Sequence, residues 1–223
     1  MRRTDELGIN NLKLIQDTEL FCFGTDSVLL ANFAKASKGD KVLDLCTGNG
    51  IIPILMTAKT NAEKFYAVEL QQKSYELAVE NVELNGLNDR LEVICGNICD
   101  CSKYFKTGSI DVITCNPPYM SPKAGFTNPD DSLAIARHEI MTNLEGVVAS
   151  AASVIKFGGH FYMVHRAERL CDIMCVMRQY RIEPKRLQYV APSPEKAPKL
   201  ILVEGIYGAN PSLRIENPVY VNI

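Results

Sequence analysis

The stretch that decides the fold is residues 41–60, which read KVLDLCTGNG IIPILMTAKT. Its first five residues are a short apolar run typical of a strand, and a glycine-rich turn follows directly. The segment from Ile51 to Thr60 is predicted to be a helix, and Pro53 is tolerated in its first turn because an N–H there would have no intrahelical partner. The order strand, tight turn, helix is the first half of a parallel β-α-β unit.

The same alternation continues along the chain. Further strands are predicted at 64–68, 91–95, 110–115 and 160–165, and further helices at 71–84, 137–156 (closed by Gly158-Gly159) and 168–180. Two late strands, 186–190 and 200–207, have no helical pattern between them, so we expect an antiparallel pair at one edge. These elements predict one α/β domain over 1–223: a doubly wound, mostly parallel, seven-stranded sheet over 41–223, preceded by an extension over 1–40.

Composition narrows the class of protein. The chain has 223 residues, 47% hydrophobic and 22% charged, with a net charge of −2, which excludes a polybasic protein that holds nucleic acid by charge alone. The N-terminal residues MRRTDE lead into no apolar signal segment, and no stretch is apolar enough to span a membrane, so we expect a cytoplasmic protein. The eight cysteines lack metal-ligand spacing, and we interpret Cys95, Cys99, Cys101, Cys171 and Cys175 as buried free thiols rather than a metal site.

The turn after the first strand of the core has the features of a ligand-binding loop. Asp44 precedes Gly48 and Gly50, and Glu69 closes the next strand, at the offset where a carboxylate accepts the hydroxyls of a ribose. The position of a third glycine is taken by Pro53, so this is not the dinucleotide fingerprint. A tight turn whose glycines only permit close packing is the alternative interpretation.

The most informative stretch, Asn116-Pro117-Pro118-Tyr119, follows the predicted strand 110–115. Two prolines remove two backbone donors and fix φ, which makes the loop stiff. Together with the glycine loop, this tetrapeptide resembles class I S-adenosylmethionine-dependent methyltransferases with an N-P-P-Y motif, which methylate exocyclic or amide nitrogens. A purely structural turn is the alternative.

The resemblance extends over nearly the whole chain. Phe23 to Leu30 and the Ala136-Arg137-His138-Glu139 run are similar to the bacterial family of tRNA adenine-N6 methyltransferases that modify adenine 37 of valine tRNA. The resemblance implies a Rossmann-like methyltransferase sheet, S-adenosyl-L-methionine as cofactor, and an N-terminal extension that covers the cofactor. The residues it implies in cofactor binding are Phe23, Thr25, Asp26, Asp44, Cys46, Thr47, Gly48, Gly50, Glu69, Leu70, Asn97, Ile98 and Asn116. Asn97 stands where the family usually has an acid, and a plain turn asparagine is the alternative; Thr25 and Asp26 also suit a helix N-cap.

The implied chemistry explains the residue types of the tetrapeptide. The N6 lone pair of adenine is delocalised into the ring, and two acceptors, the Asn116 side-chain oxygen and the Pro117 carbonyl, would favour the pyramidal form that resembles the transition state. Tyr119 would stack on the base. No strong base is needed, because the nitrogen loses its proton after the transfer.

Two other enzymes and one non-enzymatic role remain as alternatives. A glutamine-N5 methyltransferase of release factors carries the same tetrapeptide, but we expect it to have an N-terminal helical domain for which residues 1–40 are too few. A DNA adenine methyltransferase would add a target-recognition domain. A cofactor-binding or RNA-binding module without turnover is the third alternative.

The charge distribution suggests where tRNA would bind. Residues 156–199 contain nine basic residues against four acidic ones, so we expect this stretch to contact phosphates; a solvated helix surface is the alternative. His138, at the start of the predicted long helix, is either a contact to the substrate backbone or an ordinary helix start. His160 and His165 are interpreted as structural.

Overall fold

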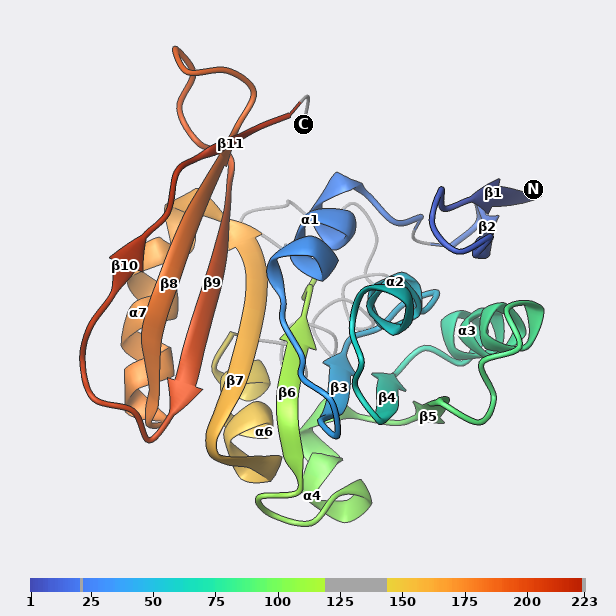
Figure 1. The fold of residues 1–223 in the computed structure, drawn as a ribbon, viewed down its shortest axis with the longest axis horizontal. Coiled ribbons are helices and arrows are strands. Elements are labelled where there is room, and N and C mark those ends of the chain that lie inside the picture. Colours follow the sequence, from blue (N-terminus) through green and yellow to red (C-terminus); the bar gives the residue numbers. More distant parts are fainter. Residues whose placement is uncertain (21, 119–143, 222–223) are drawn as a thin grey trace, which may run out of the picture.

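The computed structural model describes residues 1–20, 22–118 and 144–221. A mostly parallel sheet runs through the molecule with helices on both faces (Figure 1). The helices are α1 (Thr25–Phe33), α2 (Ile51–Lys59), α3 (Gln72–Leu84), α4 (Cys101–Tyr104), α6 (Leu144–Val154) and α7 (Leu170–Gln179), with short 3-10 turns η1 (Ile98–Asp100) and η2 (Ala167–Arg169). The strands are β1 (Arg2–Glu6), β2 (Lys13–Asp17), β3 (Lys41–Leu45), β4 (Lys64–Glu69), β5 (Leu91–Cys95), β6 (Ile110–Cys115), β7 (Ile155–Arg166), β8 (Ile182–Ala191), β9 (Leu200–Tyr207), β10 (Arg214–Ile215) and β11 (Val219–Tyr220).

The strand order of the sheet is β10-β8-β9-β7-β6-β3-β4-β5, with β11 also paired to β8. Strands β3 to β7 are mutually parallel, and β9 pairs antiparallel with both β7 and β8. This confirms the predicted doubly wound sheet with an antiparallel pair. It adds the two-residue strands β10 and β11, which both pair parallel with β8 and so cover its outer edge.

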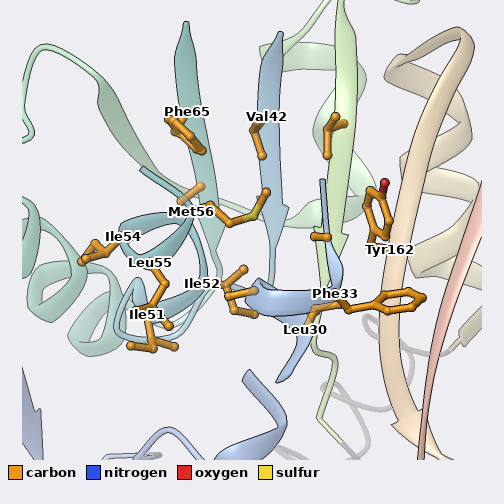
Figure 2. Close-up of a cluster of buried hydrophobic side chains, with 14 of the residues drawn as sticks. Leu30, Phe33, Val42, Ile51, Ile52, Ile54, Leu55, Met56, Phe65 and Tyr162 are labelled. Atoms are coloured by element: carbon orange, nitrogen blue, oxygen red, sulfur yellow. The ribbon is translucent and has the colours of Figure 1, made fainter. Parts of the chain in front are cut away.

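Two apolar layers hold the helices to the sheet. One layer packs α1 and α2 against β3, β4 and β7, and Figure 2 shows its side chains, among them Leu30, Ile52 and Phe65. The Phe33 and Tyr162 rings meet edge to face in this layer, with centroids 5.9 Å apart. The second layer joins α4, α6 and α7 to the opposite face. Because successive residues of a strand point to opposite faces, Val42 enters the first layer and Leu43 the second.

The prediction for the segment around Gly158-Gly159 was wrong. Within the described residues the helix ends at Val154, and β7 begins at Ile155 and contains both glycines. The register between β6 and β7 shifts here, Gly158 has φ +79°, and a Cβ on Gly159 would lie 2.9 Å from the Asp111 carbonyl oxygen. The glycine pair therefore forms a bulge in a strand and does not end a helix. Residues 137–143 of the predicted helix, His138 included, lie outside the described residues.

The N-terminal extension contains a hairpin and a helix. Strands β1 and β2 pair antiparallel, and the turn between them uses left-handed conformations at Gly8, Asn10 and Asn11. Helix α1 follows, and Gly24, not Thr25 or Asp26, is its N-cap residue. Among the described residues, no helix is long and apolar enough to cross a membrane.

Candidate functional site

A cavity of about 250 Å³ opens at the carboxyl ends of β3, β4 and β6. Parallel strands place their following loops at this edge, where ligands of doubly wound sheets bind. The predicted residues that line the cavity are Phe23, Asp26, Cys46, Thr47, Gly48, Glu69, Leu70, Asn97, Ile98, Asn116, Pro117 and Pro118. Thr25, Asp44 and Gly50 do not line it, and Tyr119 lies outside the described residues.

The glycine loop leaves β3 through three left-handed residues: Cys46 with φ +60°, Gly48 with φ +59° and Gly50 with φ +85°. For Cys46 this conformation costs about 1 to 2 kcal/mol, and a strained non-glycine residue in a loop of this kind is typical of functional sites. Gly50 is the N-cap of α2. A Cβ on Gly48 would meet no atom within 4 Å, so this glycine is required by its backbone conformation and faces open space.

The Glu69 side chain links the end of β4 to the loop that follows β3, at the wall of the cavity. It is 7% exposed, and its Oε2 accepts a hydrogen bond of 2.8 Å from the Gly48 N–H. Its Oε1 accepts one of 2.9 Å from the Gln71 N–H. Both contacts fix the carboxylate at the cavity, and each oxygen retains a further lone pair for a hydroxyl donor.

Asp44 lies behind the glycine loop with no exposed surface. Thr114 Oγ1 donates a hydrogen bond of 2.6 Å to its Oδ1. Within the described part of the chain, Asp44 Oδ2, Thr47 Oγ1 and Asn49 Nδ2 are buried without a hydrogen-bond partner. Burial raises the pKa of Asp44 to about 7, with a smaller contribution from the negative charge of Glu69 and against the opposing effects of the Thr114 and Thr47 hydroxyls. Buried polar atoms without partners beside a cavity fit a polar ligand, and a cation in that ligand would favour the ionised carboxylate of Asp44.

The loop after β6 faces the glycine loop because β3 and β6 are adjacent, with Leu45 opposite Cys115. Asn116 Nδ2 donates a hydrogen bond of 2.9 Å to Ser27 Oγ on α1. Helix α1 therefore holds the Asn116 amide in one orientation at the cavity, and the N-terminal extension contributes to the site through Phe23, Asp26 and Ser27.

Asn97 caps a short helix at the edge of the cavity, as the alternative of a turn asparagine predicted. Its side chain lies on the cavity wall, and its Oδ1 accepts a hydrogen bond of 2.9 Å from the Cys99 N–H, which caps η1. The oxygen expected to contact a ligand is therefore already used as a helix cap.

Six further residues line the cavity that were not predicted from the sequence, namely Ser27, Asn49, Ile51, Ile52, Gln71 and Ser74. Most of them stand next to predicted positions, in the first turns of α2 and α3 or beside Glu69. Their direction toward the cavity follows from the loop geometry, which motif spacing alone does not reveal.

The interpretation of five cysteines as buried thiols was wrong for all but Cys101. Cys95, Cys99, Cys171 and Cys175 are exposed, because they lie at the end of a strand, in η1 and on the outer face of α7. The described residues contain no group of three or more potential metal-binding side chains. Two histidines lie on β7. The His160 side chain contacts the Glu204 carboxylate at 2.7 Å. His165 is buried, and burial lowers its pKa to about 4.

The basic stretch 156–199 does not form one face. Ion pairs to carboxylates hold five of its cations, namely Lys156, Arg166, Arg169, Arg178 and Arg186. Strand direction separates the stretch into two ends: Lys156, Arg181 and Lys185 lie toward the amino end of β6, whereas Arg166, Arg169, Lys196 and Lys199 lie at the carboxyl end with the cavity.

Comparison with known proteins defines the class. Residues 13–180 match the family model of the methyltransferase small domain. The chain belongs to this family and is a methyltransferase, as the glycine loop and the Asn-Pro-Pro turn predicted.

The chain is similar to particular enzymes within that class. It is 29% identical over 187 residues to a protein of Porphyromonas gingivalis named tRNA1(Val) (adenine(37)-N6)-methyltransferase, covering 81% of this chain and 72% of the relative. A relative of the same name from Tolumonas auensis is 28% identical over 197 residues, covering 84% and 77%.

Solved structures share the fold. A predicted O-methyltransferase from Agrobacterium tumefaciens has a TM-score of 0.71 at 18% identity, covering 87% of this chain and 86% of that one. The geranyl diphosphate C-methyltransferase of Streptomyces coelicolor, solved with S-adenosyl-L-homocysteine, has a TM-score of 0.59 at 11% identity, covering 82% and 78%.

Proposed function

We propose that this protein is an S-adenosylmethionine-dependent methyltransferase that methylates the exocyclic N6 of an adenine in tRNA, adenine 37 beside the anticodon of valine tRNA. The observation that carries the proposal is that Asn116, Pro117 and Pro118 line the same cavity as Glu69 and the glycine loop. The names of the curated relatives support the substrate. A base in the anticodon loop is unpaired and can be turned out into such a site at low cost.

The residues around the cavity fit the cofactor. Glu69, which the Gly48 N–H holds at the cavity, would accept the ribose hydroxyls, the glycine loop would let the backbone approach, and the ionised carboxylate of Asp44 would add negative charge behind the loop. When bound, S-adenosylmethionine supplies a methyl group on a positively charged sulfur.

The chain's own part in the reaction is to orient the target nitrogen. Because Nδ2 of Asn116 donates to Ser27, the Oδ1 of the same amide is the atom that accepts a hydrogen from N6, and the Pro117 carbonyl accepts the other. These two acceptors localise the nitrogen lone pair toward the methyl group. After the transfer the nitrogen releases its extra proton to solvent. The stacking role of Tyr119 stays a prediction from the sequence.

The test uses purified protein, radiolabelled cofactor and three acceptors: valine tRNA, a release factor and duplex DNA. We expect label in the tRNA, recovered as N6-methyladenosine after digestion. A transcript with guanine in place of adenine 37 is the matched control and should take up no label. Label in the release factor and none in tRNA would contradict the proposal.

The cations at the carboxyl end of the sheet are proposed to contact tRNA phosphates. Lys196 and Lys199 are exposed there, and Lys38 and Lys106 are exposed at the amino end. Changing Lys196 and Lys199 together to Gln should weaken tRNA binding and reduce the slope of log K against log salt by about 1 to 2. The Lys38→Gln, Lys106→Gln double variant has the same charge and should bind as the wild type does; equal loss in both would contradict the assignment.

A further inference from the structure

Two asparagines, Asn81 on α3 and Asn85 at the C-cap of the same helix, bind the N-terminal hairpin through its backbone. Asn81 accepts a hydrogen bond of 2.6 Å from the Ile15 N–H and donates one of 3.0 Å to the Ile15 carbonyl. Asn85 does the same with Lys13, at 2.9 Å and 2.7 Å. A side-chain amide carries the same donor and acceptor as a peptide group. Four residues of helix and two residues of strand each rise about 6 to 7 Å, so the pair matches the edge of β2 as a neighbouring strand would.

Asn81 makes one contact that Asn85 lacks among the described residues. Its Nδ2 also donates a hydrogen bond of 3.0 Å to the Asn49 carbonyl, inside the glycine loop. Asn81 is completely buried, and Asn49 lines the cavity. The Asn81 side chain thus links the hairpin, α3 and the glycine loop, whereas the Asn85 side chain links only the hairpin and α3.

The glycine loop needs such support. Three of its residues have left-handed backbones, and two of these are glycines, which have wide conformational freedom. The Asn49 carbonyl is fixed by a donor whose own position depends on the hairpin. Loss of this donor lets the Asn49 carbonyl rotate, and with it the Gly50 N–H of the same peptide group, which donates a hydrogen bond of 3.0 Å to the Thr47 carbonyl. The loop would then leave the arrangement that receives a ligand.

We propose that Asn81 is a positioning residue for the cofactor loop, and that through it the N-terminal hairpin sets the affinity for the cofactor without taking part in methyl transfer. The inference rests on the proposed function only for the identity of the cofactor. Asn81 touches the loop and the hairpin; its effect on the ligand passes through Asn49.

The test compares Asn81→Ala with Asn85→Ala, which loses the two equivalent hydrogen bonds to Lys13 and a bond of 2.7 Å to the Asn81 carbonyl, and keeps the contact between the Asn81 side chain and the loop. S-adenosylmethionine binding is measured by calorimetry, and turnover at saturating cofactor is measured in parallel. We expect Asn81→Ala to raise Kd and the cofactor KM about tenfold or more with kcat nearly unchanged, and Asn85→Ala to change Kd less than about threefold. Amide exchange at residues 47–50 should quicken only in Asn81→Ala.

Equal affinities and equal loop exchange in the two variants would overturn the inference. If Asn81→Ala fails to fold, Asn81→Asp is used in its place. The aspartate Oδ1 can still accept from the Ile15 N–H, whereas the donor to the Asn49 carbonyl is lost. We expect its cofactor Kd to exceed that of Asn85→Ala by the same factor. A wild-type protein that binds no S-adenosylmethionine would instead contradict the proposed function, so the two failures are distinguishable.

Discussion

Two buried carboxylates, Glu204 on β9 and Asp44 on β3, have opposite surroundings. Glu204 is 4% exposed and contacts His160 at 2.7 Å, the Tyr162 hydroxyl at 3.1 Å and Arg186 at 2.7 Å. Burial acts to raise the pKa of Glu204, but hydrogen bonds from these partners outweigh it and hold the pKa below its usual 4.5. In the part of the chain that the structure describes, Asp44 has no charged partner to offset its burial, accepts a hydrogen bond from Thr114, and has its pKa raised to about 7 by burial.

The difference distinguishes scaffold from site. The polar groups around Glu204 satisfy one another and leave nothing for a ligand, so their role is to hold β7, β8 and β9 together. The polar groups around Asp44 are left short of partners among the described residues, which lowers stability unless a ligand completes them. Variants on the two sides should therefore behave differently: loss of the Glu204 charge should lower stability and leave activity nearly unchanged, whereas changes at the site should lower activity or cofactor affinity without lowering stability.

Asn116→Ala is expected to have the largest effect. Loss of one transition-state acceptor should lower kcat by about 10²- to 10³-fold, while cofactor Kd changes little, because the cofactor keeps Glu69 and the glycine loop. Single-turnover methylation with labelled cofactor measures the rate and calorimetry the affinity. A collapse of cofactor binding with a smaller loss of rate would assign Asn116 to the cofactor instead.

Glu204→Gln tests the scaffold side. Removing the charge that pairs with Arg186 should lower the free energy of unfolding by about 2 to 4 kcal/mol at pH 7, with kcat nearly unchanged. The pKa of Glu204 is below 4.5 in the folded state, so its stabilising effect is present above that pH and is lost as pH falls further. Urea unfolding at pH 7 and pH 4 checks both; equal losses at the two pH values would be evidence against the ion pair as the cause.

Asp44→Asn should raise the stability of the protein, whereas Glu204→Gln should lower it. Between pH 3.8 and about 7 the folded chain holds a proton on Asp44 that the unfolded chain has released, so wild-type stability falls as pH rises through this window. The variant lacks this loss of stability. Its free energy of unfolding relative to that of wild type should therefore increase by on the order of 2 to 3 kcal/mol from pH 5 to pH 8. Urea unfolding at the two pH values measures it.

The same variant should weaken cofactor binding. Its Kd at pH 8 is expected to rise about tenfold, because a negative charge behind the loop is lost. Wild-type affinity should increase as pH rises through 7, whereas the affinity of the variant should stay level. A variant that binds the cofactor as tightly as wild type at pH 8 would remove Asp44 from the site.

Ser27→Ala is expected to have the smallest effect. Without the Ser27 hydroxyl the Asn116 amide can rotate, so kcat should fall about tenfold, less than in Asn116→Ala. Adding Ser27→Ala to Asn116→Ala should cause no further loss, because Ser27 acts through Asn116. A further tenfold loss in the double variant would show a separate role.

The core strands and the two motif loops could be predicted from the sequence because their signals are local. Strand 110–115 was predicted with its observed bounds. Glu69 and Asn116 were found because Glu69 is the last residue of one buried strand and Asn116 directly follows another. Strand β8 was predicted four residues too short at its start, where Pro184 and charged residues hide the pattern.

What the sequence could not reveal depends on tertiary partners. The strand β1 has a polar sequence without alternation, and the hairpin it forms with β2 is held through β2 by helix side chains more than sixty residues away. The Ser27 contact to Asn116 spans 89 residues. Gly158-Gly159 has the composition of a helix stop, and only the facing strand β6 shows that it is a bulge.

The short strands β10 and β11 bear on how the protein behaves in solution. They occupy the outer edge of the ten-residue strand β8, and Glu216 N–H and Val221 N–H extend the cover with hydrogen bonds of 2.8 Å and 3.0 Å. Removing residues 212–223 would expose a long row of unpaired backbone donors and acceptors that another chain could join. A truncated protein should therefore self-associate at concentrations where the full chain stays dispersed, although its cavity would be untouched.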